Sequence, residues 1–542
     1  MLGPSGALDE LTALKSLESA AEHWGERVKN PSALYLAEDG RGVAVLPDPL
    51  GGAIVFIWRS PTATYVSSSI PALVAAAEHR GDRPRKSLEY QVERSLVGNG
   101  GLLPASYEGF EALEMATWAM VTEAGVEARS YASFEDDLDY SGSYFELLAQ
   151  ARADIMESVT AIAGLEVDKH ISHLTGGFDS RLTLAAIRAA GLTDRFQFFT
   201  SGPVGTPDRD VSDLLSGHYG LTRTNDAGLS TYPVAGVRET FLGPMRNSGG
   251  ITSSGPTGRE TPFEVAAVGG GYGGLLRSTH SRLLPEVFTG PLQSPGNGKG
   301  LCESLWGPNV LAEDGLASPD AIARLRERTT ENFTQLRGLG AADDQLGDLH
   351  YTSGRNRYHF GQNSVLWSRY GYRFDPLYSR AGARISRMLP LGPRSANVVG
   401  FDLLTAFSEE LAGLPFDKPR FTGEFARYRR VPPARSYRAG DFTTHRHEAR
   451  YPAPVSEPVS ESDREKFVAQ SKRFGVNYWQ VSQMAETQQG LQEALANIDA
   501  TDLAGSLNLD YVRRLSKYRP RNRAEIRHLY SVYSMLLWYF EG

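Results

Sequence analysis

A seven-residue stretch, Thr175-Gly176-Gly177-Phe178-Asp179-Ser180-Arg181, has the composition of a loop that binds phosphate. Two adjacent glycines allow a tight turn that aims successive backbone N–H groups into one cavity, and Thr175 and Ser180 add hydroxyl donors. A helix that begins here adds the partial positive charge of its N-terminus. Asp179 is then placed to hold Mg²⁺, because a carboxylate beside a phosphate needs a cation between them. The pattern therefore predicts a polyphosphate-binding loop, and the alternative is a plain glycine turn capped by Asp179.

The segments around this loop alternate between strand and helix patterns. Hydrophobic periodicity predicts strands over His170–Leu174, Phe196–Thr200 and Glu264–Val268, and helices over Arg181–Ala190 and Asp208–Gly220. Strands separated by helices predict right-handed crossovers and a parallel sheet. Ligands of such sheets bind beyond the carboxyl ends of the strands, which is where the glycine-rich loop falls.

The chain divides around this α/β region into three predicted parts. Residues 1–140 contain short strands and a hairpin signal at Asp39-Gly40, which predicts a layered antiparallel β domain. Residues 141–440 begin with a helix that Ser143 and Glu146 cap, hold the parallel sheet, and become mostly helical in their second half. Residues 441–542 continue an irregular basic stretch, 422–458, and end in helices that we expect to pack on the 141–440 domain. The irregular stretch is either a solvated loop or a site for an acidic peptide or polyphosphate.

Composition excludes several classes of function. The chain has 542 residues, with 56 basic and 64 acidic side chains and a net charge of −8, which argues against a general nucleic-acid or anionic-membrane binder. The single cysteine, Cys302, excludes an intramolecular disulfide and a zinc site of several cysteines. No stretch is apolar enough to span a membrane, and the N-terminus lacks the apolar core of a signal peptide. We therefore expect a cytoplasmic protein without nucleic-acid or membrane partners.

With these motifs in place, the sequence resembles the asparagine synthetase-like branch of the pyrophosphate-loop ATP pyrophosphatases over about residues 141–440. Besides the loop, Phe198-Phe199-Thr200-Ser201-Gly202 resembles the end of the second strand, which contacts adenosine in that family. Val268–Gly274 resembles its third Gly-rich loop. Tyr372–Leu377 resembles its Arg-x-Pro-Phe-Leu-Asp stretch with the order altered. Residues 1–140 look like the family's class II amidotransferase domain.

The resemblance implies an ATP-dependent ligase that forms amide bonds. In this branch the loop grips the pyrophosphate of ATP, a substrate carboxylate attacks the α-phosphate, and an amine takes up the acyl-adenylate. ATP and Mg²⁺ are the implied cofactors, with Asp179 on the metal and Arg357 and Arg373 as catalytic cations against the leaving pyrophosphate. The residues implied to bind the nucleotide are Leu174, Thr175, Gly176, Gly177, Asp179, Ser180, Thr200, Ser201, Gly269 and Gly270.

One departure from the family concerns the nitrogen source. Glutamine-using members carry a cysteine nucleophile at residue 2, whereas this chain has Leu2, whose hydrocarbon side chain cannot attack an amide. We therefore expect no glutaminase activity and an N-terminal remnant, as in members that make β-lactams or close lasso-peptide macrolactams. The implied substrate is a small molecule or peptide that carries both a carboxylate and an amine, and a peptide-maturation protein is a candidate partner.

A second departure concerns charge at the third loop, which lacks the acidic residue that usually completes the metal site. Glu264, Asp208 or Asp210 could supply it, or Asp179 and the phosphates alone could hold Mg²⁺. The family's catalytic lysine has no match either, because no lysine occurs between Lys299 and Lys418.

Further candidates keep more than one interpretation. Arg277 follows the third loop and either pairs with an anion or lies on the surface. Arg355 and Arg369 are further candidate cations, and His350 and His359 are either bases or structural. A degenerate nucleotide-binding or scaffold protein of a biosynthetic complex therefore stays open as an alternative, as does an asparagine synthetase that uses free ammonia.

Overall fold

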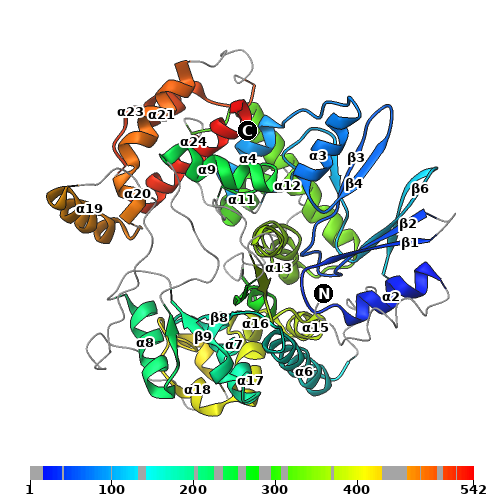
Figure 1. Ribbon diagram of the computed structural model, residues 1–542, viewed down its shortest axis with the longest axis vertical. Helices are drawn as coiled ribbons and strands as arrows, with labels where there is room; N and C mark the ends of the chain where they lie inside the picture. Colours follow the sequence, from blue (N-terminus) through cyan, green and yellow to red (C-terminus); the bar gives the residue numbers. More distant parts are fainter. Residues whose placement is uncertain are drawn as a thin grey trace.

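The computed structural model describes residues 16–541 apart from 39–41, 99–100, 132–141, 201–205, 225–235, 254–263, 280–294, 307–314, 368–370, 430–459, 477, 497–504 and 521. It is an α/β structure with antiparallel sheets near the N-terminus and a parallel sheet further along the chain, as the sequence predicts (Figure 1). The acidic stretch 135–139 and most of the basic stretch 422–458 lie outside the described residues.

The N-terminal part is built from two antiparallel sheets. One has the order β1-β2-β6-β7 and the other β4-β3-β5. The predicted hairpin is confirmed, since Leu34 pairs with Leu46 and Glu38 with Gly42. The strands are β1 Ala33–Glu38, β2 Gly42–Pro47, β3 Phe56–Arg59, β4 Thr64–Ser67, β5 Phe110–Ala112, β6 Thr117–Thr122 and β7 Gly125–Ser130.

These sheets form the middle layers of a four-layer arrangement. Val45, Ile57 and Ala119 belong to one buried cluster between the two sheets. Helix α2 (Leu17–Arg27) covers the outer face of the first sheet through Trp24, while α3 (Ile70–His79) and α4 (Leu88–Val97) pack beside the second. The layered β prediction therefore holds for this part of the chain.

The parallel sheet has the order β10-β9-β8-β11-β12, and every neighbouring pair is parallel. Its strands are β8 Lys169–His173, β9 Gln197–Phe199, β10 Arg223–Thr224, β11 Val265–Val268 and β12 Tyr372–Phe374. The chain moves outward from the central strand β8 to β10, and then returns to β11 on the other side. This reversal places the loop after β8 beside the loop after β11, at the kind of position where open α/β sheets bind ligands.

Helices cover this sheet and continue to the C-terminus. Ser143 caps the first of them through the backbone N–H of Glu146, as predicted. The helices are α6 Tyr144–Ala163, α7 Phe178–Ala189, α8 Pro207–Tyr219, α9 Gly236–Ser248, α11 Pro295–Trp306, α12 Pro319–Gly338, α13 Leu346–Tyr351, α14 Gln362–Trp367, α15 Arg380–Met388, α16 Leu391–Ser395, α17 Val398–Phe407, α18 Glu409–Gly413, α19 Glu461–Phe474, α20 Tyr478–Ser482, α21 Met484–Ala496, α23 Leu509–Lys517 and α24 Arg523–Glu541. Short 3₁₀ turns cover η3 Thr193–Arg195, η4 Gly273–Leu276, η6 Asp343–Gln345 and η8 Gly423–Tyr428, and a π-helix, η7 Thr352–Gly361, joins α13 to α14.

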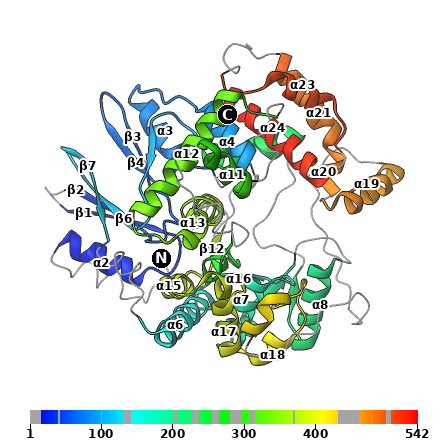
Figure 2. The same cartoon turned by 180° about the vertical axis from the view of Figure 1, so that it is seen from behind.

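The C-terminal helices contact the 141–440 region, as expected, and the N-terminal part as well. Helix α24 contacts α9 of the 141–440 region but also α4 of the N-terminal part, at the opposite end of the molecule from the parallel sheet (Figures 1 and 2). Leu88, Met245 and Leu536 share one buried cluster, whereas the parallel sheet has a separate core that includes Leu182 and Phe198. The apolar face of the last helix therefore joins the N-terminal and C-terminal ends of the chain.

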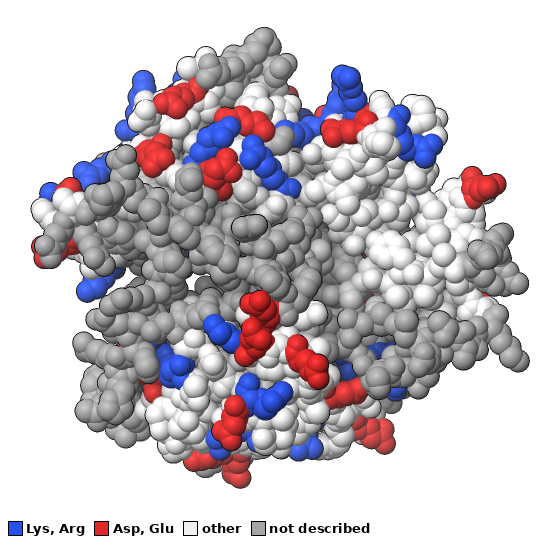
Figure 3. All heavy atoms as spheres, viewed as in Figure 1, with Lys and Arg blue, Asp and Glu red and all other residues white. Residues whose placement is uncertain are grey.

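Two features of the structure concern membrane and nucleic-acid partners. Among the described residues, no helix combines the length and apolar character needed to cross a membrane. On the face seen in Figure 3, the described Lys and Arg side chains are interspersed with Asp and Glu. This part of the surface therefore presents no extended basic area.

Candidate active site

The Thr175–Ser180 loop is held in shape by its own side chains. The hydroxyl oxygen of Ser180 accepts from the backbone N–H of Thr175 at 3.0 Å, and that of Thr175 accepts from the N–H of Gly177 at 3.1 Å. The N–H of Gly176 donates to the backbone carbonyl of Asp208 at 2.9 Å. A Cβ on Gly176 would lie 2.9 Å from Cβ of Asp417 and 3.0 Å from Cα of Asp208, so glycine is required there.

Helix α7 begins directly at this loop without a capping side chain. Its first N–H groups, those of Phe178, Asp179 and Ser180, have no acceptor among the described residues. Free N–H groups at the start of a helix, together with its dipole, form a site for an anion. The start of α7 therefore offers donors for an anion, whereas the N–H groups of Gly176 and Gly177, which the motif predicts as donors, are engaged by Asp208 and Thr175.

Asp179 does not point at an open metal position, because Arg277 holds both of its carboxylate oxygens. Nη1 of Arg277 lies 2.5 Å from Oδ1 of Asp179, and Nη2 lies 2.9 Å from Oδ2. Nη1 also donates to the carbonyl of Gly273 at 3.1 Å. Burial by itself lowers the pKa of Arg277, but the attraction of the Asp179 carboxylate outweighs it and raises that pKa.

The third Gly-rich loop packs against Asp179 so closely that it has no room for a side chain. A Cβ on Gly270 would lie 3.1 Å from Cβ of Asp179, and a Cβ on Gly273 would lie 2.5 Å from its Cγ. The loop turns at Tyr272, which has a left-handed backbone (φ 66°) and buries its ring. The backbone of the third loop and the guanidinium of Arg277 therefore occupy the space around Asp179 in which the family's acidic residue would lie.

These residues do not fit a Mg²⁺ ion held directly by Asp179. Both of its oxygens are taken by a cation, and the described residues contain no group of three or more His, Cys, Asp or Glu placed to hold a metal. Glu264 lies beside Lys169 at the start of β8, at the opposite end of the strand from the loop. Asp179 and Glu264, as they are placed, therefore do not form the metal site that the sequence leads us to expect.

Asp208, one of the acidic residues that the sequence offers for the metal, lies at the Thr175–Ser180 loop together with Asp417. Burial and the neighbouring Asp417 raise the pKa of its carboxyl group, while donors from Thr175, Gly176 and Gly177 act in the opposite direction. Asp417 reaches the loop because its N–H donates to the carbonyl of Gly176 at 3.1 Å. The adjacent Lys418 is exposed, so the lysine that appears remote in the sequence follows directly after a residue that contacts the loop.

Arg373 lies beside the third loop. It is in strand β12, which pairs with β11, and its Nη2 would be 2.9 Å from a Cβ on Gly269. Its Nε is buried without a partner among the described residues. Burial, together with Arg355 and Arg373, lowers the pKa of His359 to about 4, so these three side chains share one positively charged region. Arg369 lies outside the described residues.

Arg357, in the same π-helix as Arg355 and His359, contacts the N-terminal part, which does not favour the expected catalytic role. It is buried in the π-helix η7, and its Nε and Nη2 donate to the carbonyls of Gly51 at 2.9 Å and Leu113 at 2.6 Å. Both acceptors belong to the N-terminal part. Because Nε and Nη2 donate to backbone carbonyls there, Arg357 joins the two parts of the chain, and these two nitrogens are not available to a leaving pyrophosphate.

The remaining predicted residues at the sheet edge are engaged in structure. The hydroxyl groups of Thr200 and Ser212 lie 2.5 Å apart in the buried interior, and Ser212 also donates to the carbonyl of Leu174 at 3.2 Å. Ser201 lies outside the described residues. His350 packs against the ring of Phe333, with centroids 5.4 Å apart, which agrees with its structural interpretation.

Tyr351 is a site residue that the sequence does not indicate. A Cβ on Gly274 would lie 2.6 Å from its hydroxyl oxygen, and the charges of Arg277, Arg355 and Asp179 all influence its phenol. Burial raises the pKa of Tyr351, while the two arginines lower it. It ends helix α13 within no recognisable motif, so only the fold brings it to the loop.

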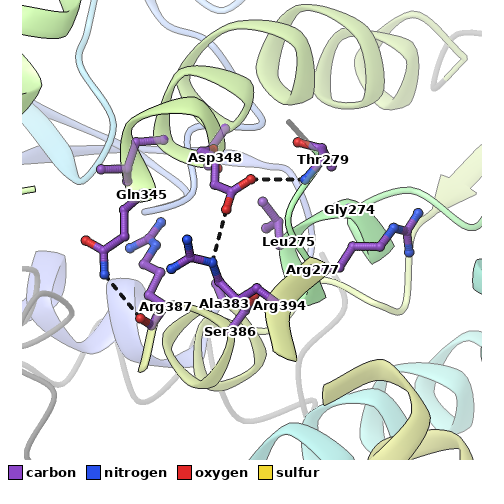
Figure 4. A pocket seen from close by; sticks show the side chains of 12 residues that line it. Gly274, Leu275, Arg277, Thr279, Gln345, Asp348, Ala383, Ser386, Arg387 and Arg394 are labelled. Atoms are coloured by element: carbon purple, nitrogen blue, oxygen red, sulfur yellow. Dashed lines mark hydrogen bonds and ion pairs between the residues drawn. The ribbon is translucent and has the colours of Figure 1, made fainter. Parts of the chain in front are cut away.

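A small cavity lies behind the third loop (Figure 4). Oδ1 of Asp348 accepts from the N–H of Thr279 at 3.0 Å, and its Oδ2 lies 3.3 Å from Nε of Arg394. The Arg277 side chain points away from Asp348 and Arg394 (Figure 4). The cavity has room for little more than a water molecule, so it is part of the support for the loop and not a substrate site.

Comparison with protein-family models and with curated proteins finds no match to this chain.

Proposed function

We propose that this chain is an ATP-dependent, AMP-forming ligase that joins a carboxylate to an amine without hydrolysing glutamine. The observation that carries the proposal is the uncapped start of α7 after a Thr-Gly-Gly turn, at the carboxyl edge of a parallel sheet. Three N–H groups that have no acceptor in the described part of the chain, with arginines on the neighbouring loop and strand, suit a polyphosphate.

The reaction has two steps. An oxygen of the substrate carboxylate attacks the α-phosphorus of ATP, the bond to the bridging oxygen breaks, and pyrophosphate leaves. The amine nitrogen then attacks the acyl carbon of the adenylate, AMP departs with the bonding electrons, and the nitrogen loses a proton to a base. Holding both reactants in one site supplies much of the rate of such a transfer.

The protein residues contribute binding and charge in this proposal. The N–H groups at Phe178–Ser180 hold phosphate oxygens, and Gly269 and Gly270 let the third loop approach the nucleotide. Arg373 and Arg355 stabilise the charge that develops on the leaving pyrophosphate. The adenosine lies against the carboxyl end of β9, near Thr200. The substrate carries its own amine, as in macrolactam formation, since Leu2 offers no nucleophile for glutamine.

A nucleotide-binding protein without ligase activity is the second candidate. The observation that favours it is the closed Asp179–Arg277 pair, which takes the predicted metal ligand out of use. This candidate shares ATP binding at the loop with the first and differs only in chemistry. Asparagine synthesis from free ammonia has no observation that favours it.

ATP–pyrophosphate exchange distinguishes the two candidates. Purified protein is incubated with ATP, labelled pyrophosphate and a panel of amino acids, dicarboxylic acids and short peptides. We expect exchange that depends on one carboxylate and falls at least about tenfold in Arg373→Ala, because the leaving group loses a cation. Arg59→Ala, which removes an exposed arginine from β3, is the control and should keep full exchange. ATP binding without exchange for any acid would favour the second candidate.

A further inference from the structure

Arg277 stands where a protein-held cation is expected. It faces Asp179 with two nitrogens, as a cation would. Asp179 belongs to the first turn of α7, whose first three N–H groups have no acceptor among the residues that the structure describes. The side chains of Arg277 and Asp179 are 27% and 28% exposed, so a ligand at the loop can reach the pair. The positive charge beside Asp179 is therefore supplied by a side chain of the protein.

The guanidinium keeps donors available after it has bound Asp179. Of its five N–H groups, Nη1 directs two at Asp179 and Gly273, and Nη2 directs one at Asp179. The Nε–H and the second N–H of Nη2 have no acceptor among the described residues. Guanidinium N–H groups are well suited to phosphate oxygens because they are planar, permanently charged and paired.

The same geometry disfavours a divalent ion on the protein. A metal bound to Asp179 would have to displace Arg277 or lie beside its positive charge, and Gly273 leaves no space for a second acidic side chain. A fixed guanidinium needs neither an open coordination position nor a second carboxylate.

We propose that Arg277 is the built-in cation of this site. It is anchored by Asp179 and offers its remaining N–H groups to a phosphate oxygen of the nucleotide, so that the protein binds polyphosphate without holding a divalent ion. This inference rests on the proposed nucleotide binding and specifies the chemistry of that same site.

The test is a calorimetric titration with ATP, and separately with inorganic tripolyphosphate, in EDTA and in excess Mg²⁺. We expect the wild type to bind both probes in EDTA with affinities within about threefold of those in Mg²⁺. Arg277→Ala should bind at least about tenfold more weakly in EDTA and regain affinity in Mg²⁺, because Asp179 is then free for a metal. Arg277→Lys keeps the charge but loses the paired donors, and should lie between the two.

Arg337→Ala serves as the matched control. Arg337→Ala removes an arginine that is 28% exposed and pairs with Asp343 at 2.7 Å outside the loop, and it should leave both affinities unchanged. Wild-type binding that requires Mg²⁺ would overturn the inference while leaving the ligase proposal standing. No binding under either condition would overturn both. These wild-type outcomes decide the question even where Arg277→Ala does not fold.

Discussion

The hydroxyl group of Tyr378 donates to Oδ1 of Asp48 at 2.9 Å, between the N-terminal sheets and the parallel-sheet region. Asp48 is buried, and Gly52 and Ala53 donate to its carboxylate from their backbones at 3.0 and 2.7 Å. The ring of Tyr378 lies 5.1 Å from that of Tyr272 in the third Gly-rich loop. The N-terminal part therefore supports the loop that presents Arg277, which is a role for this part that does not depend on chemistry of its own.

Tyr378→Phe should weaken this support. Burial raises the pKa of Asp48, and loss of the phenol removes one of the donors that act against that rise. We expect a loss of about 1–3 kcal/mol in the free energy of unfolding, measured by urea denaturation. Tyr35→Phe, at an exposed tyrosine of β1, should change stability by less than about 1 kcal/mol. Equal stability of Tyr378→Phe and the wild type would show that this contact does not hold the two parts together.

Arg357→Ala should lower the stability of the protein without changing its affinity for ATP. The variant leaves the carbonyls of Gly51 and Leu113 without their donor, so we expect about 2–4 kcal/mol of lost stability. The affinity of the folded variant for ATP should stay within about twofold of the wild type. A large loss of ATP affinity at unchanged melting temperature would restore the catalytic role that the sequence suggests.

His359 should make stability fall in mild acid. Burial and the two nearby arginines lower its pKa to about 4 in the folded protein, whereas the unfolded chain titrates near about 6.5. Below about pH 6.5 the unfolded state takes up a proton that the folded state refuses, so stability is lost progressively until about pH 4, by at most about 3 kcal/mol. His359→Gln should flatten this part of the profile in thermal melts between these pH values. If the slope of stability against pH is unchanged in His359→Gln, a group other than His359 causes the loss of stability in acid.

The elements around the loop could be predicted because their signals are local. Ser143 caps its helix through spacing alone, and β8, β9 and β11 follow hydrophobic periodicity. Arg357 could not be placed, because its partners Gly51 and Leu113 are some 300 and 240 residues away and are backbone atoms that carry no side-chain signal. Asp179 illustrates the same limit. Its motif indicates a phosphate loop, but its pairing with Arg277 depends on how closely Gly273 approaches in the fold.

The most direct test of the central claim is the affinity for ATP of the wild type and of Ser180→Ala, measured by calorimetry. Ser180 holds the loop through the N–H of Thr175, and loss of its hydroxyl should disorder the donors that face the phosphates. We predict that the wild type binds ATP, that Ser180→Ala binds at least about tenfold more weakly, and that Thr160→Ala on the exposed face of α6 binds like the wild type. Absence of ATP binding by the wild type, or equal binding by Ser180→Ala, would contradict the assignment of this loop as the nucleotide site.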